Sequence, residues 1–146
     1  MQPSVSRWML SATAVALIGI GAYFIIARPP FLPEDLRYIG ATEEAMRASA
    51  PKLSNWLSLV FRVMGGFIIA TGTILLSVVT LDDLSRQPLR LLAVAVAALA
   101  SLGIMVRVNF EIGSDYRWFL LAVLGLWCVG IVTAIAGVGL HRGSRR

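Results

Sequence analysis

Four long apolar segments divide the chain, and short polar segments separate them. These apolar segments cover residues 8–27, 56–80, 89–106 and 118–139. A helix needs about 20 mostly apolar residues to cross the hydrocarbon core of a bilayer. The third segment is the shortest, and the long side chains of Arg90 and Arg107 at its ends extend its reach to the lipid headgroups. The pattern predicts four transmembrane helices; the alternative is three, with a re-entrant third segment.

The longest polar segment, residues 28–55, contains signals for two short helices. Residues 33–38 are predicted to form the first, which Gly40 ends because glycine accepts the left-handed backbone common after a helix. Thr42 is predicted to cap the second helix, and acidic residues follow it in the first turn. Pro51 disfavours helix in the residue before it, so the second helix ends near residue 50. Both helices are predicted to lie on the membrane surface against the bundle.

Polar and apolar residues alternate over residues 106–112, after the third apolar segment. Strict alternation is the pattern of a half-buried strand. We therefore predict a short extended piece here, packed against the long loop.

Composition supports the membrane class. The chain has 146 residues, of which 58% are hydrophobic and 14% charged, whereas about 25% are charged in a typical soluble domain. The fold class is therefore all-α: a single membrane domain over residues 1–146, built as a four-transmembrane-helix bundle. The formal net charge is +5, but the arginines flank apolar segments. They suit lipid headgroups rather than nucleic acid.

Equal numbers of Lys and Arg flank the two ends of the bundle, but on one side they stand in much shorter segments beside the helix ends. Those are Arg7, Arg86, Arg90, Arg142, Arg145 and Arg146, against Arg28, Arg37, Arg47, Lys52, Arg107 and Arg117. Short positively charged loops stay in the cytoplasm. Both termini are therefore predicted to be cytoplasmic, and the loop of residues 28–55 faces outward.

The side-chain inventory argues against several membrane chemistries. The chain has one cysteine, Cys128, and one histidine, His141, and the four apolar segments hold no carboxylate. Disulfide exchange needs paired thiols, bis-histidine haem needs two histidines, and Ser–His proteolysis needs an intramembrane base. We predict no cofactor and no metal, and an enzyme is the least favoured class. Carboxylates clustered around an open pocket at the outer surface would favour a lipid-modifying enzyme.

Arg62 is the single charge in the second apolar segment, ~9 Å deeper than Trp56 at 1.5 Å per residue. It shares a helix face with small and polar residues, which predicts a side chain turned into the bundle and paired. The candidate partners are Glu34, Asp35, Glu43, Glu44, Glu111 and Asp115. One interpretation is an anion or headgroup site between helices. The simpler one is an arginine that reaches the outer surface or holds the loop on the bundle.

One stretch resembles a known group of proteins. The run from Phe31 to Gly40 (FLPEDLRYIG), then Pro51, Arg62 and Gly65-Gly66, is similar to a pattern in small bacterial four-span membrane proteins of DoxX-like outline. The resemblance covers roughly the first half of the chain. It implies a bacterial inner-membrane location and no activity. It also implies that Asp35, Tyr38, Gly40 and Arg62 are the positions to test.

Three functions follow from these patterns. The preferred one is a non-catalytic accessory or interaction subunit, which contacts lipid and binds a protein partner or a second copy through its outer loop and small-residue helix faces. Those faces include Ala12, Ala16, Gly19 and Gly21, then Gly65, Gly66, Ala70, Gly72 and Thr73, then Ala93, Ala97 and Ser101, and finally Gly130, Ala134 and Gly137. The alternative is lipid or small-molecule binding or transport around Arg62, which an intramembrane cavity would favour and a close-packed bundle would disfavour. A membrane enzyme ranks last.

Overall fold

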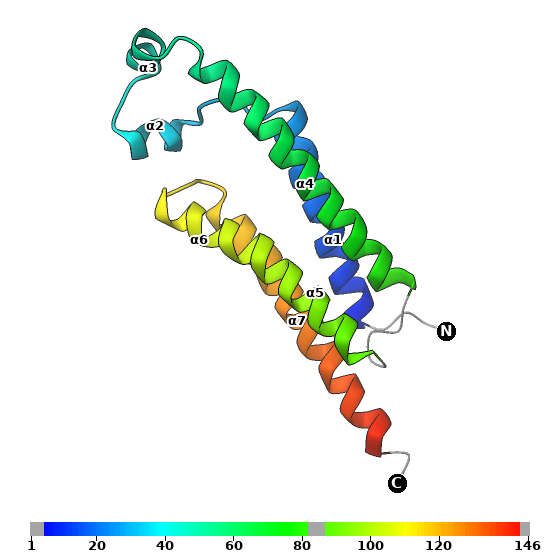
Figure 1. The fold of residues 1–146 in the computed structure, drawn as a ribbon. Coiled ribbons are helices and arrows are strands. Elements are labelled where there is room, and N and C mark those ends of the chain that lie inside the picture. The colour runs from blue at the N-terminus through cyan, green and yellow to red at the C-terminus, as the bar shows by residue number, and fades with distance from the viewer. Residues whose placement is uncertain (1–4, 82–86, 144–146) are drawn as a thin grey trace.

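A computed structural model of the chain describes the backbone of residues 5–81 and 87–143, with side chains up to residue 136. The described residues form helices joined by turns, without a strand, so the all-α prediction is confirmed. Four helices are long and apolar enough to cross a membrane, and the protein is an integral membrane protein (Figure 1). They cover Val5–Ile26, Leu53–Leu81, Pro88–Glu111 and Arg117–Ala136. The four-span prediction is confirmed, and the re-entrant alternative is wrong.

The first and second spans, α1 (Val5–Ile26) and α4 (Leu53–Leu81), form a close antiparallel pair. Three glycines allow the close approach of their backbones. A Cβ atom added at Gly65 would lie 2.6 Å from the carbonyl oxygen of Gly21, and one at Gly72 would lie 2.9 Å from that of Ala14. Small residues allow membrane helices to pack through backbone contact. The predicted small-residue faces of these two helices therefore serve, in part, to hold α1 against α4.

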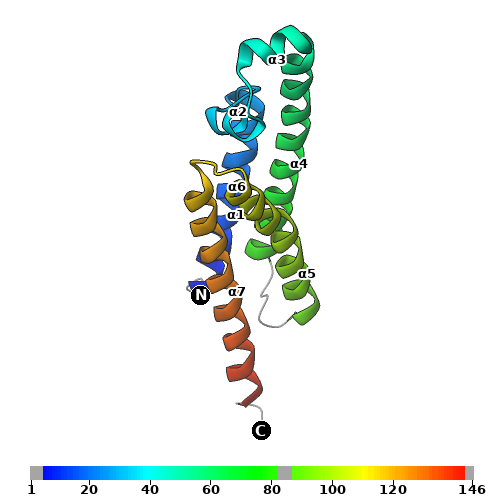
Figure 2. The ribbon, with the colours of Figure 1, turned by 90° about the vertical axis from the view of Figure 1, so that its left-hand side faces the viewer.

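Two short helices cover one end of the bundle, as predicted: α2 (Pro33–Ile39) and α3 (Glu43–Ser49) (Figure 2). Gly40 ends α2 with φ 72°, a conformation that favours glycine. The Thr42 side chain accepts a hydrogen bond from the Ala45 backbone N–H at 3.2 Å and so caps α3. We call the end that carries α2, α3 and residues 112–116 the loop end.

The third span is one helix with a wider turn inside it. It consists of α5 (Pro88–Ala98), the π-helical turn η2 (Leu99–Gly103) and α6 (Ile104–Glu111). The predicted extended segment at residues 106–112 is therefore wrong, because residues 104–111 are helical. A helix satisfies its backbone N–H and C=O groups within itself, whereas a lone strand beside lipid leaves them unpaired. The chain then turns at Gly113, where φ is 68°.

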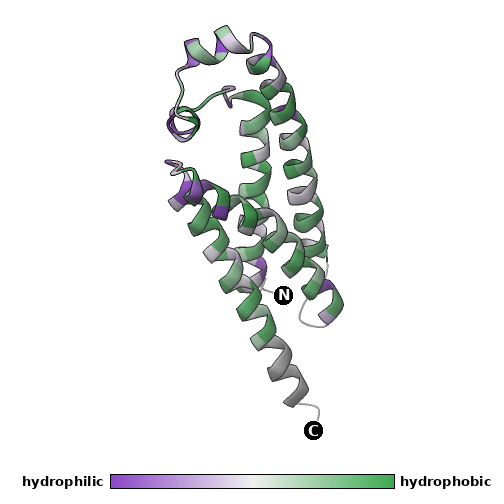
Figure 3. Ribbon diagram, turned by 60° about the vertical axis from the view of Figure 1, so that its left-hand side comes forward, coloured by the Kyte–Doolittle hydropathy of each residue, from purple (hydrophilic) through white to green (hydrophobic). Residues whose placement is uncertain are grey.

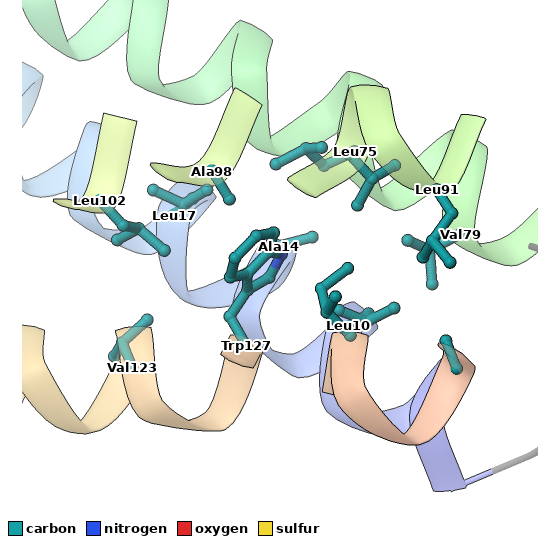
Figure 4. Packing of buried hydrophobic residues seen from close by; sticks show 13 residues of the cluster. Leu10, Ala14, Leu17, Leu75, Val79, Leu91, Ala98, Leu102, Val123 and Trp127 are labelled. Carbon is teal, nitrogen blue, oxygen red and sulfur yellow. The ribbon is translucent and has the colours of Figure 1, made fainter. Parts of the chain in front are cut away.

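The fourth span, α7 (Arg117–Gly143), packs against α1 on the side away from α4. Buried side chains fill the part of the bundle farther from the loop end, where Trp127 lies at the centre of the cluster (Figure 4). The cluster comprises Leu10, Ala14, Leu17, Leu75, Val79, Leu91, Val94, Ala98, Leu102, Val123, Trp127, Ile131 and Ala134. Helix α4 packs against α5 in this region, and the third span then diverges from it (Figure 1). The bundle is thus closed at one end and wider at the loop end.

Hydrophilic residues gather at the loop end, on α2, α3 and the turn between α6 and α7 (Figure 3). The long helices below them are mostly hydrophobic on every side, as lipid-embedded helices are. Arg86, Arg145 and Arg146, which the topology prediction counts, lie outside the described residues, and His141 lies beyond the described side chains. The cytoplasmic position of both termini stays a prediction.

Candidate functional site

A cavity of about 820 Å³ occupies the wider, loop-end half of the bundle. Its volume lies within the roughly 300–1,000 Å³ of typical ligand pockets. All four spans, α2 and both connections at the loop end contribute to its wall. The lining residues are Ala16, Gly19, Ile20, Tyr23, Phe24, Arg28, Leu32, Glu34, Asp35, Phe61, Met64, Phe67, Ile68, Ala100, Ser101, Ile104, Met105, Val108, Asn109, Ile112, Ser114, Tyr116, Phe119 and Leu120.

The cavity is amphipathic along its length. Its charged lining residues, Arg28, Glu34 and Asp35, all come from the end of α1 and from α2, at the loop end. Ser114 joins them from the turn before α7. Away from that end the wall is built almost entirely of aliphatic, aromatic and small side chains. A molecule with a polar head and an apolar body matches this division.

The cavity opens sideways between α4 and the third span. Met64 and Phe67 of α4 line the cavity and are exposed at the bundle surface, as are Ile104 and Val108 of α6. Exposed apolar side chains on the flank of a transmembrane helix contact lipid tails. The opening therefore connects the cavity with the hydrocarbon region of the bilayer.

Arg28, just after the end of α1, is buried by ion pairing and by aromatic rings. Its Nη2 donates a hydrogen bond to Asp35 Oδ2 at 3.2 Å, and the side chains of Arg28 and Asp35 are only 10% and 18% exposed. Its guanidinium carbon lies 3.6 Å from the centroid of the Phe61 ring and 5.2 Å from that of Phe24. Asp35 Oδ2 also accepts from the Leu32 backbone N–H at 2.9 Å, at the start of α2. This carboxylate thus caps α2 and fixes the arginine.

Glu34, the neighbour of Asp35, is 2% exposed and ties α2 to the turn before α7. Ser114 Oγ donates to Glu34 Oε1 at 3.1 Å, and it accepts from the Tyr116 backbone N–H at 3.2 Å. The Tyr116 ring lies 6.2 Å, between centroids, from the ring of Tyr23 on α1. Two segments distant in sequence are therefore joined around a buried carboxylate at the polar end of the cavity.

The structure brings two of the predicted site residues to this cavity, Glu34 and Asp35. Tyr38 and Glu111 are exposed and do not line it. Asp115 forms an exposed ion pair with Arg37, with 3.6 Å between Nη2 and Oδ1. Exposed pairs of this kind contribute little to stability.

The prediction that Arg62 turns into the bundle is wrong, because its side chain is exposed. It has no hydrogen bond or ion pair with any residue that the structure describes. The physical reason is the position of Arg62 along α4 and the rotation of that helix about its axis. Helix α4 has 29 residues, more than the roughly 20 that a span needs, and Phe61 lies level with Arg28, just beyond the end of α1. Arg62 is therefore close to the loop end of the bundle, level with Arg28. The simpler interpretation, an arginine whose long side chain reaches the outer surface or holds the loop on the bundle, stays a prediction.

Arg28 and Ser114 are two polar residues of this site that were not predicted from the sequence, and the aromatic residues Tyr23, Phe24 and Tyr116 of its wall were not predicted either. Arg28 stands directly before Pro29 and seven residues before Asp35. A chain reversal there brings the two charges together, so the spacing was a usable signal. Ser114 and Glu34 are 80 residues apart, and the sequence holds no signal for that contact.

Comparison of the chain with protein-family models, with curated proteins and with solved structures gave no match. The resemblance to DoxX-like proteins stays a prediction. Among the residues that the structure describes, no group of three His, Cys, Asp or Glu side chains is placed to hold a metal ion.

Proposed function

We propose that the protein binds a lipid or another small amphiphile in the loop-end cavity. One observation carries the proposal: the cavity is apolar along most of its wall, charged at one end and open to the side of the bundle. A bilayer lipid has the same division between head and tail, and a lateral opening admits it without a passage through water. Delivery or transport of the bound molecule is a further step within the same proposal.

This function is the alternative that the sequence analysis ranked second, and the cavity is the feature that favours it over the first. A close-packed bundle would have argued against binding, yet the loop-end half of the bundle holds a cavity, although α1 and α4 stay in close contact there. The accessory-subunit prediction used the outer loop and the small-residue helix faces. Part of those faces, Gly21, Gly65 and Gly72, lies in the contact between α1 and α4, whereas Gly66 meets nothing within 4 Å.

An enzyme that modifies the head of the bound molecule is the second candidate, because Glu34 and Asp35 line an open cavity. Asp35, however, is engaged by Arg28 and by the backbone of Leu32. Catalytic acid–base pairs need a group free to exchange a proton with the substrate. Of the two, Glu34 alone forms no ion pair with a described residue, so the site offers one free carboxylate rather than an acid–base pair, and binding is the better supported function.

We further propose a bacterial inner-membrane location with both termini in the cytoplasm, which places the loop end and the cavity in the outer leaflet. The short, arginine-rich segments at the opposite end support this orientation. A ligand would then enter from the outer leaflet between α4 and α6.

Filling the cavity tests the proposed function. Gly19 lines the cavity, and a Cβ atom added there meets nothing within 4 Å. Gly19→Trp is therefore expected to place an indole in the cavity and to reduce the bound lipid to less than half of the wild-type amount. The measurement is native mass spectrometry of protein extracted from its membrane in a mild detergent, with the lipid-to-protein ratio as the readout.

Gly125→Trp is the matched control, because Gly125 is equally open but does not line the cavity. It is expected to retain the wild-type amount of lipid. Wild-type protein without any specifically retained amphiphile, or equal retention in both variants, would show that the cavity is not a binding site.

A further inference from the structure

The Glu34 carboxylate lies at the polar end of the cavity and forms no ion pair with a residue that the structure describes. The residue lines the cavity and is 2% exposed. Its hydrogen-bond donor is the neutral hydroxyl of Ser114, and none of the ion pairs found between described residues includes it. A buried charge is costly unless it is paired. This carboxylate is therefore a place where a bound cation would be stabilised.

Arg28, the one cation among the described residues that line the cavity, is already engaged. Asp35 holds its Nη2, and the rings of Phe61 and Phe24 cover the guanidinium group. A ligand anion would have to displace Asp35 from Arg28 and would then meet the charge of Glu34. The two carboxylates and one guanidinium at this end favour a positive ligand group over a negative one.

We propose that the cavity is selective for an amphiphile with a cationic amine head, and that Glu34 is the residue that binds this head. This inference rests on the proposed function and adds the chemical class of the ligand. The ammonium group of the ligand takes the position opposite the Glu34 carboxylate, while Ser114 holds that carboxylate in place.

Aromatic side chains around the polar end support a cation there. Tyr23 and Phe24 on α1 have ring centroids 6.1 Å apart, and Tyr116 lies beside Tyr23. All three line the cavity. The electron-rich faces of such rings attract ammonium groups, as the Phe61 ring already attracts the guanidinium group of Arg28.

The apolar part of the wall accommodates the tail of the same ligand. Ile20, Ile68 and Met105 line it from three different spans. Flexible methionine side chains adapt to irregular apolar ligands. Two sources supply this chemistry: the amine head of a membrane lipid, and a hydrophobic amine that enters from outside.

The test compares ligands of one chain length and different heads. Dodecylamine, dodecanol and dodecanoate are titrated by calorimetry into wild-type protein and the Glu34→Gln variant, in a nonionic detergent near neutral pH. Glutamine keeps the acceptor for Ser114 and removes the charge. Dodecylamine is expected to bind Glu34→Gln about 10-fold or more weakly than wild type, since a hydrogen bond to a charged group contributes about that much. Dodecanol binding is expected to be unchanged.

Glu111→Gln is the control variant, because Glu111 is exposed and does not line the cavity. It is expected to bind all three ligands as wild type does, and unchanged dodecanol binding shows that Glu34→Gln is folded. A parallel titration with lysophosphatidylethanolamine separates the sources. Glu34-dependent binding of this lipid assigns a membrane aminolipid, and Glu34-dependent binding of dodecylamine alone assigns a hydrophobic amine.

The inference is overturned if wild-type protein prefers dodecanoate, or if Glu34→Gln leaves dodecylamine binding unchanged. It is also overturned if the variant loses dodecanol and dodecylamine equally. In each of these cases the cavity still binds an amphiphile, so the proposed function survives. Binding of none of the ligands to wild-type protein would instead contradict the proposed function itself.

Discussion

Arg28→Leu is expected to destabilise the protein by about 3 kcal/mol, at the lower end of the cost of breaking a buried ion pair on one side. The change leaves the Asp35 carboxylate only 18% exposed and without its cation. It also removes the guanidinium group that covers the Phe61 ring. The measurement is the midpoint of thermal unfolding in a mild detergent, followed by intrinsic tryptophan fluorescence.

A double-mutant cycle separates the ion pair from simple loss of packing. Asp35→Asn removes the charge and keeps an oxygen that accepts from the Leu32 backbone N–H, so α2 retains its cap. The double variant is expected to be more stable than Arg28→Leu alone, because no unpaired charge remains.

Arg62→Leu is the matched control, since Arg62 is exposed, and it is expected to change stability by no more than about 0.5 kcal/mol. An effect of Arg62→Leu as large as that of Arg28→Leu would contradict this account of the two arginines.

Gly65→Ala is expected to force α1 and α4 apart and to lower stability by about 1–3 kcal/mol, the usual cost of overpacking. The added methyl group would lie 2.6 Å from the Gly21 carbonyl oxygen. That atom belongs to the backbone of a helix, so no side-chain rotation relieves the clash. The thermal unfolding midpoint in detergent is again the measurement.

The adjacent glycine supplies the control. A Cβ atom at Gly66 meets nothing within 4 Å, and alanine is favoured over glycine in a helix by up to about 1 kcal/mol. Gly66→Ala is therefore expected to leave stability unchanged or to raise it slightly. Equal midpoints for Gly65→Ala and Gly66→Ala would show that close backbone packing does not hold this pair of helices.

Local features of the sequence determined the helices. Twenty or so apolar residues in succession have few alternatives to a transmembrane helix, because lipid offers no hydrogen bonds to an unpaired backbone. The two short helices were equally predictable from the sequence, since Thr42 and Gly40 act on backbone atoms within a few residues of themselves. The wrong prediction at residues 106–112 shows the limit of this reasoning. Alternation over so short a stretch is outweighed by continuation of the helix that precedes it.

Glu34 and Asp35 were among the candidate site residues predicted from the sequence, but the arginine predicted as their partner was Arg62. In the structure Arg28 pairs with Asp35 instead. Arg28 stands seven residues before Asp35, whereas Arg62 stood out as the single charge in an apolar segment. Their environments depend on how far α4 extends past the end of α1 and on the rotation of each helix, which are properties of packing between helices.

The sequence by itself therefore determined that this is a membrane protein of four spans with two short capped helices, because those features arise from hydropathy and from contacts within a few residues. Only the tertiary structure decided where the bundle is closed and where it holds a cavity. The close approach of Gly21 and Gly65 sets the register of α1 on α4 and brings Phe61 against Arg28. The same arrangement leaves Arg62 at the surface and Glu34 buried, because depth and rotation are fixed by the neighbouring helix and not by the residues adjacent in the chain.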